Sequence, residues 1–107
     1  MNFRNITNAK GKNVPNQFVI TIGNKEYFKS YDSMIVKIEN GKVYLDETYW
    51  DYSSTTSKYR NQFLGDTTKE TQRKIKSGEY ILTNLNDEED NEIIKTFKFF
   101  KWVRNIS

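Results

Sequence analysis

The sequence contains no cysteine and no histidine. Without cysteine the chain can form no disulfide, no thiolate zinc site and no cysteine nucleophile. Without histidine it lacks both an imidazole base and the commonest metal ligand. The hydroxyl groups clustered at 53–57 therefore have no imidazole to activate them. We expect a protein that is not an enzyme and that uses no cofactor and no metal.

Long apolar runs are also missing. No stretch approaches the roughly 18 apolar residues that cross a bilayer, and Met1 to Asn16 lacks the apolar core of a signal peptide. We expect no membrane partner and a cytoplasmic location. The formal net charge of +3 is too small an excess to require nucleic acid as the partner.

Aromatic residues, in contrast, are abundant: the 107 residues include 7 Phe, 7 Tyr and 2 Trp. Because each ring buries a large area, a polar chain of this composition can still form a core. The length fits one domain, so we expect a single domain over residues 1–107. Residues 1–16 contain Arg4, Lys10 and Lys12, no acidic residue and the only proline, which predicts a flexible basic arm.

Two turn signals predict antiparallel hairpins. Gly-Asn at 23–24 separates two strand-like segments and would place Ile20 opposite Tyr27. Asn-Gly at 40–41 follows a segment of alternating apolar residues and is typical of a type I′ turn. The second hairpin should bury one face and expose the other.

Two short helices are expected at about 55–64 and 67–77. Thr55 or Thr56 would be the N-cap of the first helix. Thr67 opens the second helix with a Thr-x-x-Glu capping box, and a glycine follows each helix. The second helix contains little apolar surface, which indicates that it lies on the outside of the fold.

The end of the chain predicts further strands. Residues 80–85 have strand character, 87–90 are four consecutive acidic residues, and 92–104 are rich in aromatic and β-branched residues. We expect the acidic run to be a solvated loop, because it lacks the spacing of a calcium loop. The predicted fold class is therefore α+β: an antiparallel sheet of about four or five strands with the two helices inserted.

Three short motifs carry a family resemblance: Tyr-Phe-Lys-Ser-Tyr at 27–31, Trp-Asp-Tyr-Ser at 50–53 and Lys-Tyr-Arg at 58–60. Together they resemble small uncharacterised proteins encoded by phages and mobile elements of low-GC Gram-positive bacteria. The resemblance implies a role inside a bacterial host cell and no particular chemistry. Many accessory proteins of such elements block host defence machinery, including CRISPR-associated nucleases, so an anti-CRISPR or other anti-defence role is an expectation by analogy.

The candidate partner-binding residues combine positive charge with aromatic rings. Interleaved cations and rings can contact an acidic protein or single-stranded nucleic acid, although lysines on an edge strand also protect against aggregation. The set is Lys95, Lys98, Lys101, Trp102 and Arg104 at the end of the chain, together with Arg60.

Arg60 has two interpretations. It could bind a carboxylate or phosphate of the partner in bidentate fashion, beside the rings of Trp50, Tyr52 and Tyr59. Alternatively, those rings fill the core where the sheet meets the first helix and Arg60 pairs internally with Asp51. The sequence favours this second interpretation, because aromatic residues supply much of the burial in a small domain.

Together these patterns predict a phage or mobile-element accessory protein that inhibits or modulates a host protein by occupying its surface. A defence nuclease is the expected partner class. The alternative is a small nucleic-acid-binding protein that uses the basic and aromatic end of the chain. A homodimer formed through a strand at that end is also open.

Overall fold

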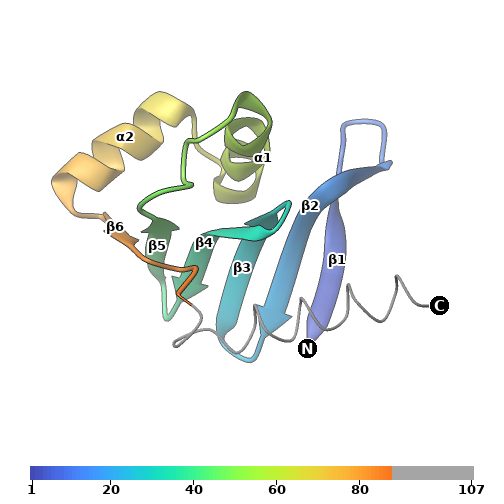
Figure 1. The fold of residues 1–107 in the computed structure, drawn as a ribbon, viewed down its shortest axis with the longest axis horizontal. Helices are drawn as coiled ribbons and strands as arrows, with labels where there is room; N and C mark the ends of the chain where they lie inside the picture. The colour runs from blue at the N-terminus through green and yellow to red at the C-terminus, as the bar shows by residue number, and fades with distance from the viewer. Residues whose placement is uncertain (88–107) are drawn as a thin grey trace.

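The computed structural model describes residues 1–87 as a six-stranded sheet with both helices on one face (Figure 1). This arrangement confirms the α+β class, although the strand count exceeds the expected four or five. The strand order in the sheet is also the order of the strands in the chain. The elements are β1 (Asn2–Thr7), β2 (Asn13–Ile22), β3 (Lys25–Ser30), β4 (Ser33–Glu39), β5 (Lys42–Asp46), α1 (Ser54–Leu64), α2 (Thr68–Ser77) and β6 (Tyr80–Thr83).

The first five strands form an antiparallel meander, and both predicted hairpins are confirmed. Ile20 lies opposite Tyr27, as the turn after β2 requires. That turn begins with Gly23 at a φ of 57°, a value that glycine adopts without steric cost. Asn40 and Gly41 both have positive φ, at 53° and 76°, which is the type I′ geometry.

The expectation of a purely antiparallel sheet is wrong at its last strand. β6 runs parallel to β5, with Val43 beside Tyr80 and Asp46 beside Thr83. Both helices lie in the connection between these two strands, and a helical crossover returns the chain to the same end of the sheet. Strand β6 therefore starts where β5 starts, and among the strands of residues 1–87 it is an edge of the sheet.

The expectation of a flexible basic arm at residues 1–16 is also wrong. Asn2 to Asn5 pair with β2, and the ring of Phe3 stacks on Phe18 with 4.9 Å between centroids. Ile6 is buried in the core. Pro15 lies where the register between β1 and β2 shifts, which is where a strand tolerates proline.

Capping side chains determine where each helix begins. The N-cap of α1 is Ser53, not Thr55 or Thr56, and its side chain accepts a hydrogen bond from the Thr56 backbone N–H. Thr56 instead lies inside the helix, buried, with its hydroxyl 2.8 Å from that of Ser30. The capping box of α2 between Thr67 and Glu70 is confirmed.

Apolar side chains gather on both faces of the sheet. The cluster beneath the helices includes Val19, Phe28 and Leu45. Alternation along the strands places Ile20 and Tyr27 on the opposite face, where they belong to a second cluster. Within residues 1–87 no helix is long and apolar enough to span a membrane.

Candidate binding surface

The connection from β5 to α1, residues 47–53, is held in place by a buried carboxylate. Asp46 is 1% exposed. Its Oδ2 accepts the backbone N–H groups of Thr48 and Tyr49 at 3.0 and 2.9 Å, while its Oδ1 accepts that of Leu85 at 2.9 Å. Because one side chain satisfies amides from two segments, the connection and the chain after β6 are fixed relative to each other.

Arg60 holds the same connection from the side of α1. Its guanidinium is fully buried, lies 5.1 Å from the centre of the Trp50 ring and donates to the Trp50 carbonyl oxygen. It also forms an ion pair with Asp51 at 3.1 Å. The other Nη group donates to Asn61 Oδ1 at 2.9 Å and to Thr68 Oγ1 at 3.0 Å. Arg60 thus links the connection to both helices.

These contacts settle which interpretation of Arg60 applies. Its guanidinium has no exposed surface and its Nη donors are used within the chain, so it cannot bind a partner directly. Its inclusion among the partner-binding residues is wrong, and the internal pair with Asp51 is found instead. The guanidinium is planar and cannot lose its charge, so it can organise a network of this kind from inside the fold.

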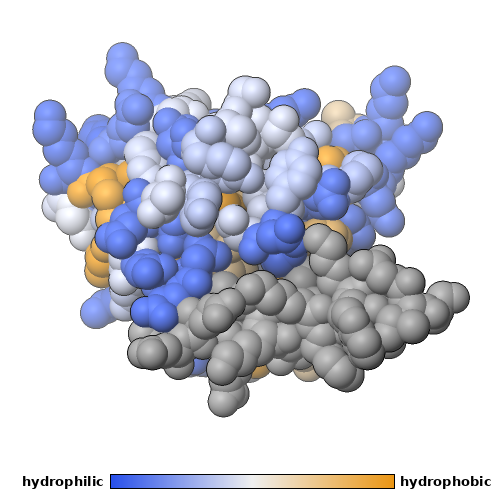
Figure 2. Space-filling view, in the orientation of Figure 1, coloured by the Kyte–Doolittle hydropathy of each residue, from blue (hydrophilic) through white to orange (hydrophobic). Residues whose placement is uncertain are grey.

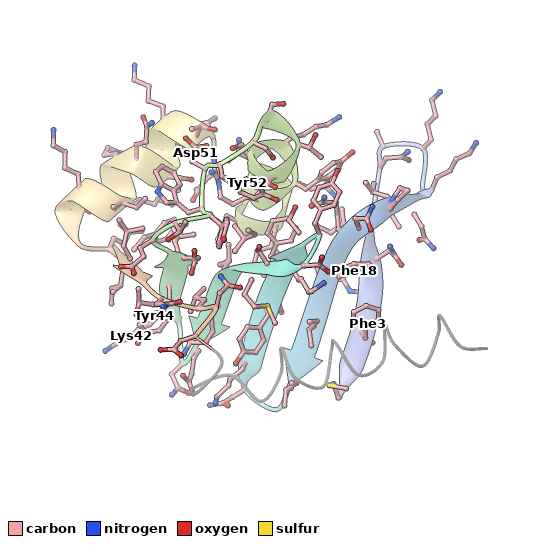
Figure 3. The ribbon with its side chains drawn as sticks, in the orientation of Figure 1. Phe3, Phe18, Lys42, Tyr44, Asp51 and Tyr52 are labelled. Carbon is pink, nitrogen blue, oxygen red and sulfur yellow. The ribbon has the colours of Figure 1, made fainter. Side chains whose placement is uncertain are left out.

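The rings on this connection have different surroundings. Trp50 is half-buried over Arg60, whereas Tyr52 keeps 45% of its surface exposed, so the expectation that Tyr52 fills the core is wrong. The Tyr49 ring packs edge-on against Tyr52, with 5.4 Å between centroids and 82° between ring planes. Figure 3 shows Asp51 and Tyr52 on the helix side of the sheet. The arrangement presents an aromatic ring to solvent from a fixed backbone, and we call residues 47–53 the aromatic connection.

A third polar contact, after those of Asp46 and Arg60, is centred on Asp66 and joins α2 to β6. Asp66 accepts hydrogen bonds from Lys74, at 2.8 Å, and from the Tyr80 hydroxyl. Burial alone would raise the pKa of Asp66, but the hydrogen bonds from Lys74 and Tyr80 and nearby positive charge outweigh it, so that pKa lies below its usual value. Burial and the contact with Asp66 raise the pKa of Tyr80. The cluster favours ionised Asp66 and neutral Tyr80.

The remaining predicted partner-binding residues, Lys95, Lys98, Lys101, Trp102 and Arg104, lie outside the described residues, as do the predicted strand at 92–104 and most of the acidic run at 87–90. Within residues 1–87 no three or more histidine, cysteine or acidic side chains gather as metal ligands would.

Sequence reasoning missed the roles of Asp46 and Asp66. Asp46 ends β5, and an aspartate at the start of a turn commonly accepts the amides two and three residues later, so its position was a signal. Asp66 lies between the two helices, and its side-chain partners Lys74 and Tyr80 leave no such local pattern.

Comparisons with known proteins identify a family. A search of curated proteins and a search of solved structures each returned no match. A family model described as "Family of unknown function (DUF8033)" matches residues 1–79, a range that contains β1 to α2 and the whole aromatic connection. Since the match spans most of the chain, the protein belongs to the DUF8033 family.

Proposed function

We propose that the protein is a stoichiometric binding protein that inhibits or modulates a host protein by occupying part of its surface. The observation that carries this proposal is the exposed Tyr52 ring on a connection fixed by two buried polar side chains, Asp46 and Arg60. Tyrosine is among the residues that contribute most to binding energy at protein interfaces. The ring offers apolar area and a hydroxyl to a partner.

Rigidity is the second reason to assign binding to this connection. A mobile loop loses conformational entropy when it binds, roughly 0.5–1.5 kcal/mol for each immobilised side chain. The Asp46 carboxylate and the Arg60 guanidinium already order the backbone of the aromatic connection before any partner arrives. The packing of Tyr49 against Tyr52 limits the motion of the exposed ring in the same way. More of the contact energy therefore remains as affinity.

The partner class follows from the resemblance of the three motifs to phage and mobile-element proteins. We propose a host defence nuclease, such as a CRISPR-associated enzyme, as the first partner to test. Under this proposal the protein acts in the bacterial cytoplasm and needs one copy for each copy of its target. Inhibition would therefore saturate at a fixed ratio of the two proteins and would show no turnover.

A matched pair of tyrosines supplies the test. Tyr52 and Tyr31 are each 45% exposed, but Tyr31 lies in the turn between β3 and β4. Tyr52→Ala should weaken partner binding at least tenfold, corresponding to about 1.4 kcal/mol, while Tyr31→Ala should leave it unchanged. Phage survival on cells that carry an active CRISPR system gives the cellular readout, and affinity capture of the nuclease gives the biochemical one. Equal loss of partner binding in both variants, or no loss in either variant, would contradict the proposal.

Binding of nucleic acid remains a second candidate because α2 carries three exposed cationic side chains, Lys69, Arg73 and Lys76. If phosphate contacts carried the function, affinity for a single-stranded oligonucleotide would fall steeply as salt concentration rises. A gel-shift titration at two salt concentrations distinguishes the candidates. A shift at low salt that disappears at high salt favours this second candidate, and no shift at low salt removes it.

A further inference from the structure

Strand β6 leaves an apolar edge of the sheet exposed. It is the last strand of the sheet, and within residues 1–87 it pairs only with β5. Ile81 and Leu82 are neighbours in the chain, so they point to opposite faces of the sheet, yet each is 40% exposed. Figure 2 shows hydrophobic surface over β6 and the adjoining end of α2, bordered by hydrophilic side chains. The backbone edge and two aliphatic side chains are thus presented together.

Natural edge strands usually carry protection against pairing with another chain, such as lysine, proline or a bulge. Strand β1, at the other end of the sheet, contains Arg4 and has an irregular register with β2. Strand β6 has the sequence Tyr-Ile-Leu-Thr, with no charge, no proline and no register shift. Among the described residues, what protects this strand is its length of 4 residues, which limits how many backbone hydrogen bonds a partner strand can form.

Helix α2 supplies charge beside this edge. Lys74 and Tyr80 join the helix to β6 through their shared partner, Asp66. Lys69, Arg73 and Lys76 are exposed and follow one another at spacings of four and three residues, so they form a stripe along one side of the helix. We call them the α2 basic stripe. A strand added to β6 would run beside α2, which lies at this end of the sheet (Figure 1).

The α2 basic stripe decides what kind of strand can bind. Two copies of this chain joined at β6 by a two-fold axis would bring both α2 helices to the same face of the joined sheet, where their positive charges repel. An acidic partner gains from the same charges. A short row of backbone hydrogen bonds to β6 and an attractive contact between opposite charges together give more affinity than either alone.

We propose that the β6 edge binds an extended segment of a partner protein, with aliphatic residues at alternate positions and acidic residues that contact the α2 basic stripe. The backbone of that segment would add a seventh strand beside β6. This inference goes beyond the proposed function and does not depend on Tyr52. The test uses the purified full chain and needs no identified host protein, so the two proposals can fail separately.

The probe is a synthetic peptide, Glu-Glu-Val-Thr-Ile-Thr-Val-Glu-Glu, blocked at both ends. The control peptide replaces every glutamate by lysine and keeps the same centre. In an NMR titration of the isotope-labelled chain, the acidic peptide should change the chemical shifts of residues in β6 and α2. We expect a dissociation constant on the order of 1 mM or tighter for this peptide. The lysine peptide should bind at least tenfold more weakly at low salt.

Two variants with similar exposure test the edge itself. Ile81→Lys puts a charge on the β6 edge and should weaken binding of the acidic peptide at least tenfold. Phe3→Lys makes the equivalent change on β1, where Phe3 is 39% exposed, and should leave binding unchanged. Arg73→Glu should weaken binding of the acidic peptide and strengthen binding of the lysine peptide. Thermal unfolding of each variant checks that the fold persists.

Several results would overturn the inference. No shift with the acidic peptide at several millimolar, or equal affinity for the two peptides, would show that the edge and the α2 basic stripe do not select an acidic strand. Concentration-dependent dimerisation that Ile81→Lys abolishes would assign the edge to a second copy. Shifts at α2 caused by a single-stranded oligonucleotide, with none from the acidic peptide, would assign the α2 basic stripe to nucleic acid.

Discussion

The β1 edge of the sheet carries Arg4 and an irregular register, whereas the β6 edge carries two exposed aliphatic side chains and no charge. The two ends also differ in how they are held. Near β1, the Phe3 ring stacks on Phe18 and Ile6 is buried in the core. Near β6, the crossover is held by buried polar groups, Asp46, Arg60 and Asp66. Polar networks with defined geometry fix the surfaces beside them, so we expect recognition at the β6 end.

The largest expected effect comes from removing Arg60. Arg60→Ala leaves a cavity and removes the donor to the Trp50 carbonyl oxygen and to Asn61 Oδ1, and should lower the free energy of unfolding by about 2–4 kcal/mol. Asp51 is 34% exposed on its side chain, so solvent limits the cost of leaving its charge unpaired. Chemical denaturation measures the change. Lys58→Ala, on the same helix but exposed, is the control and should change stability by no more than about 0.5 kcal/mol.

A smaller change of opposite sign is expected in β2, within the antiparallel part. The Gln17 side chain is fully buried, and within residues 1–87 neither its oxygen nor its nitrogen has a hydrogen-bond partner. Gln17→Met removes these polar atoms at similar volume and should stabilise the protein by about 1 kcal/mol. Gln72→Met, on the exposed side of α2, is the matched control. Destabilisation by Gln17→Met would mean that the amide is hydrogen-bonded in solution.

The smallest effect is a dependence of stability on acid pH at the β6 end of the sheet. The pKa of Asp66 is lower in the folded chain than in the unfolded one, so its stabilisation is present above about pH 4. That stabilisation is lost as pH falls through the folded-state pKa. When the pH falls from about 4 to about 2, the free energy of unfolding should therefore drop less in the Asp66→Asn variant than in the parent chain. Thermal unfolding at a series of pH values compares them, and parallel curves would contradict the assignment.

Local signals made part of the fold predictable. The residues at 23–24 and 40–41 specify their turns through backbone geometry alone, and the Thr67–Glu70 capping box is complete within four residues. The direction of β6 is a non-local property, because it depends on how two helices cross the sheet. Strand β1 was missed because Ile6 is buried only after β2 and the helices assemble over it. Pro15 and the basic residues Arg4, Lys10 and Lys12 suggested a flexible arm instead.

The candidate surfaces were less predictable for the same reason. The sequence-level alternative that paired Arg60 with Asp51 was correct, because residues nine positions apart meet where a connection folds back on its helix. The exposure of Tyr52 and of Ile81 could not be predicted, because apolar side chains in similar sequence contexts, such as Trp50 and Tyr80, are half-buried or buried. Exposure is set by which elements pack over each residue.

Amide hydrogen exchange, measured by NMR with and without the acidic peptide, tests the difference between the two edges most directly. Backbone N–H groups at an unpaired edge exchange readily, and a docked strand protects them. We expect the peptide to slow exchange at Ile81, Leu82 and their neighbours in β6, while exchange in β1 stays the same. Protection of β1 instead of β6, or equal protection of both, would contradict the claim that the β6 end is the one built for recognition.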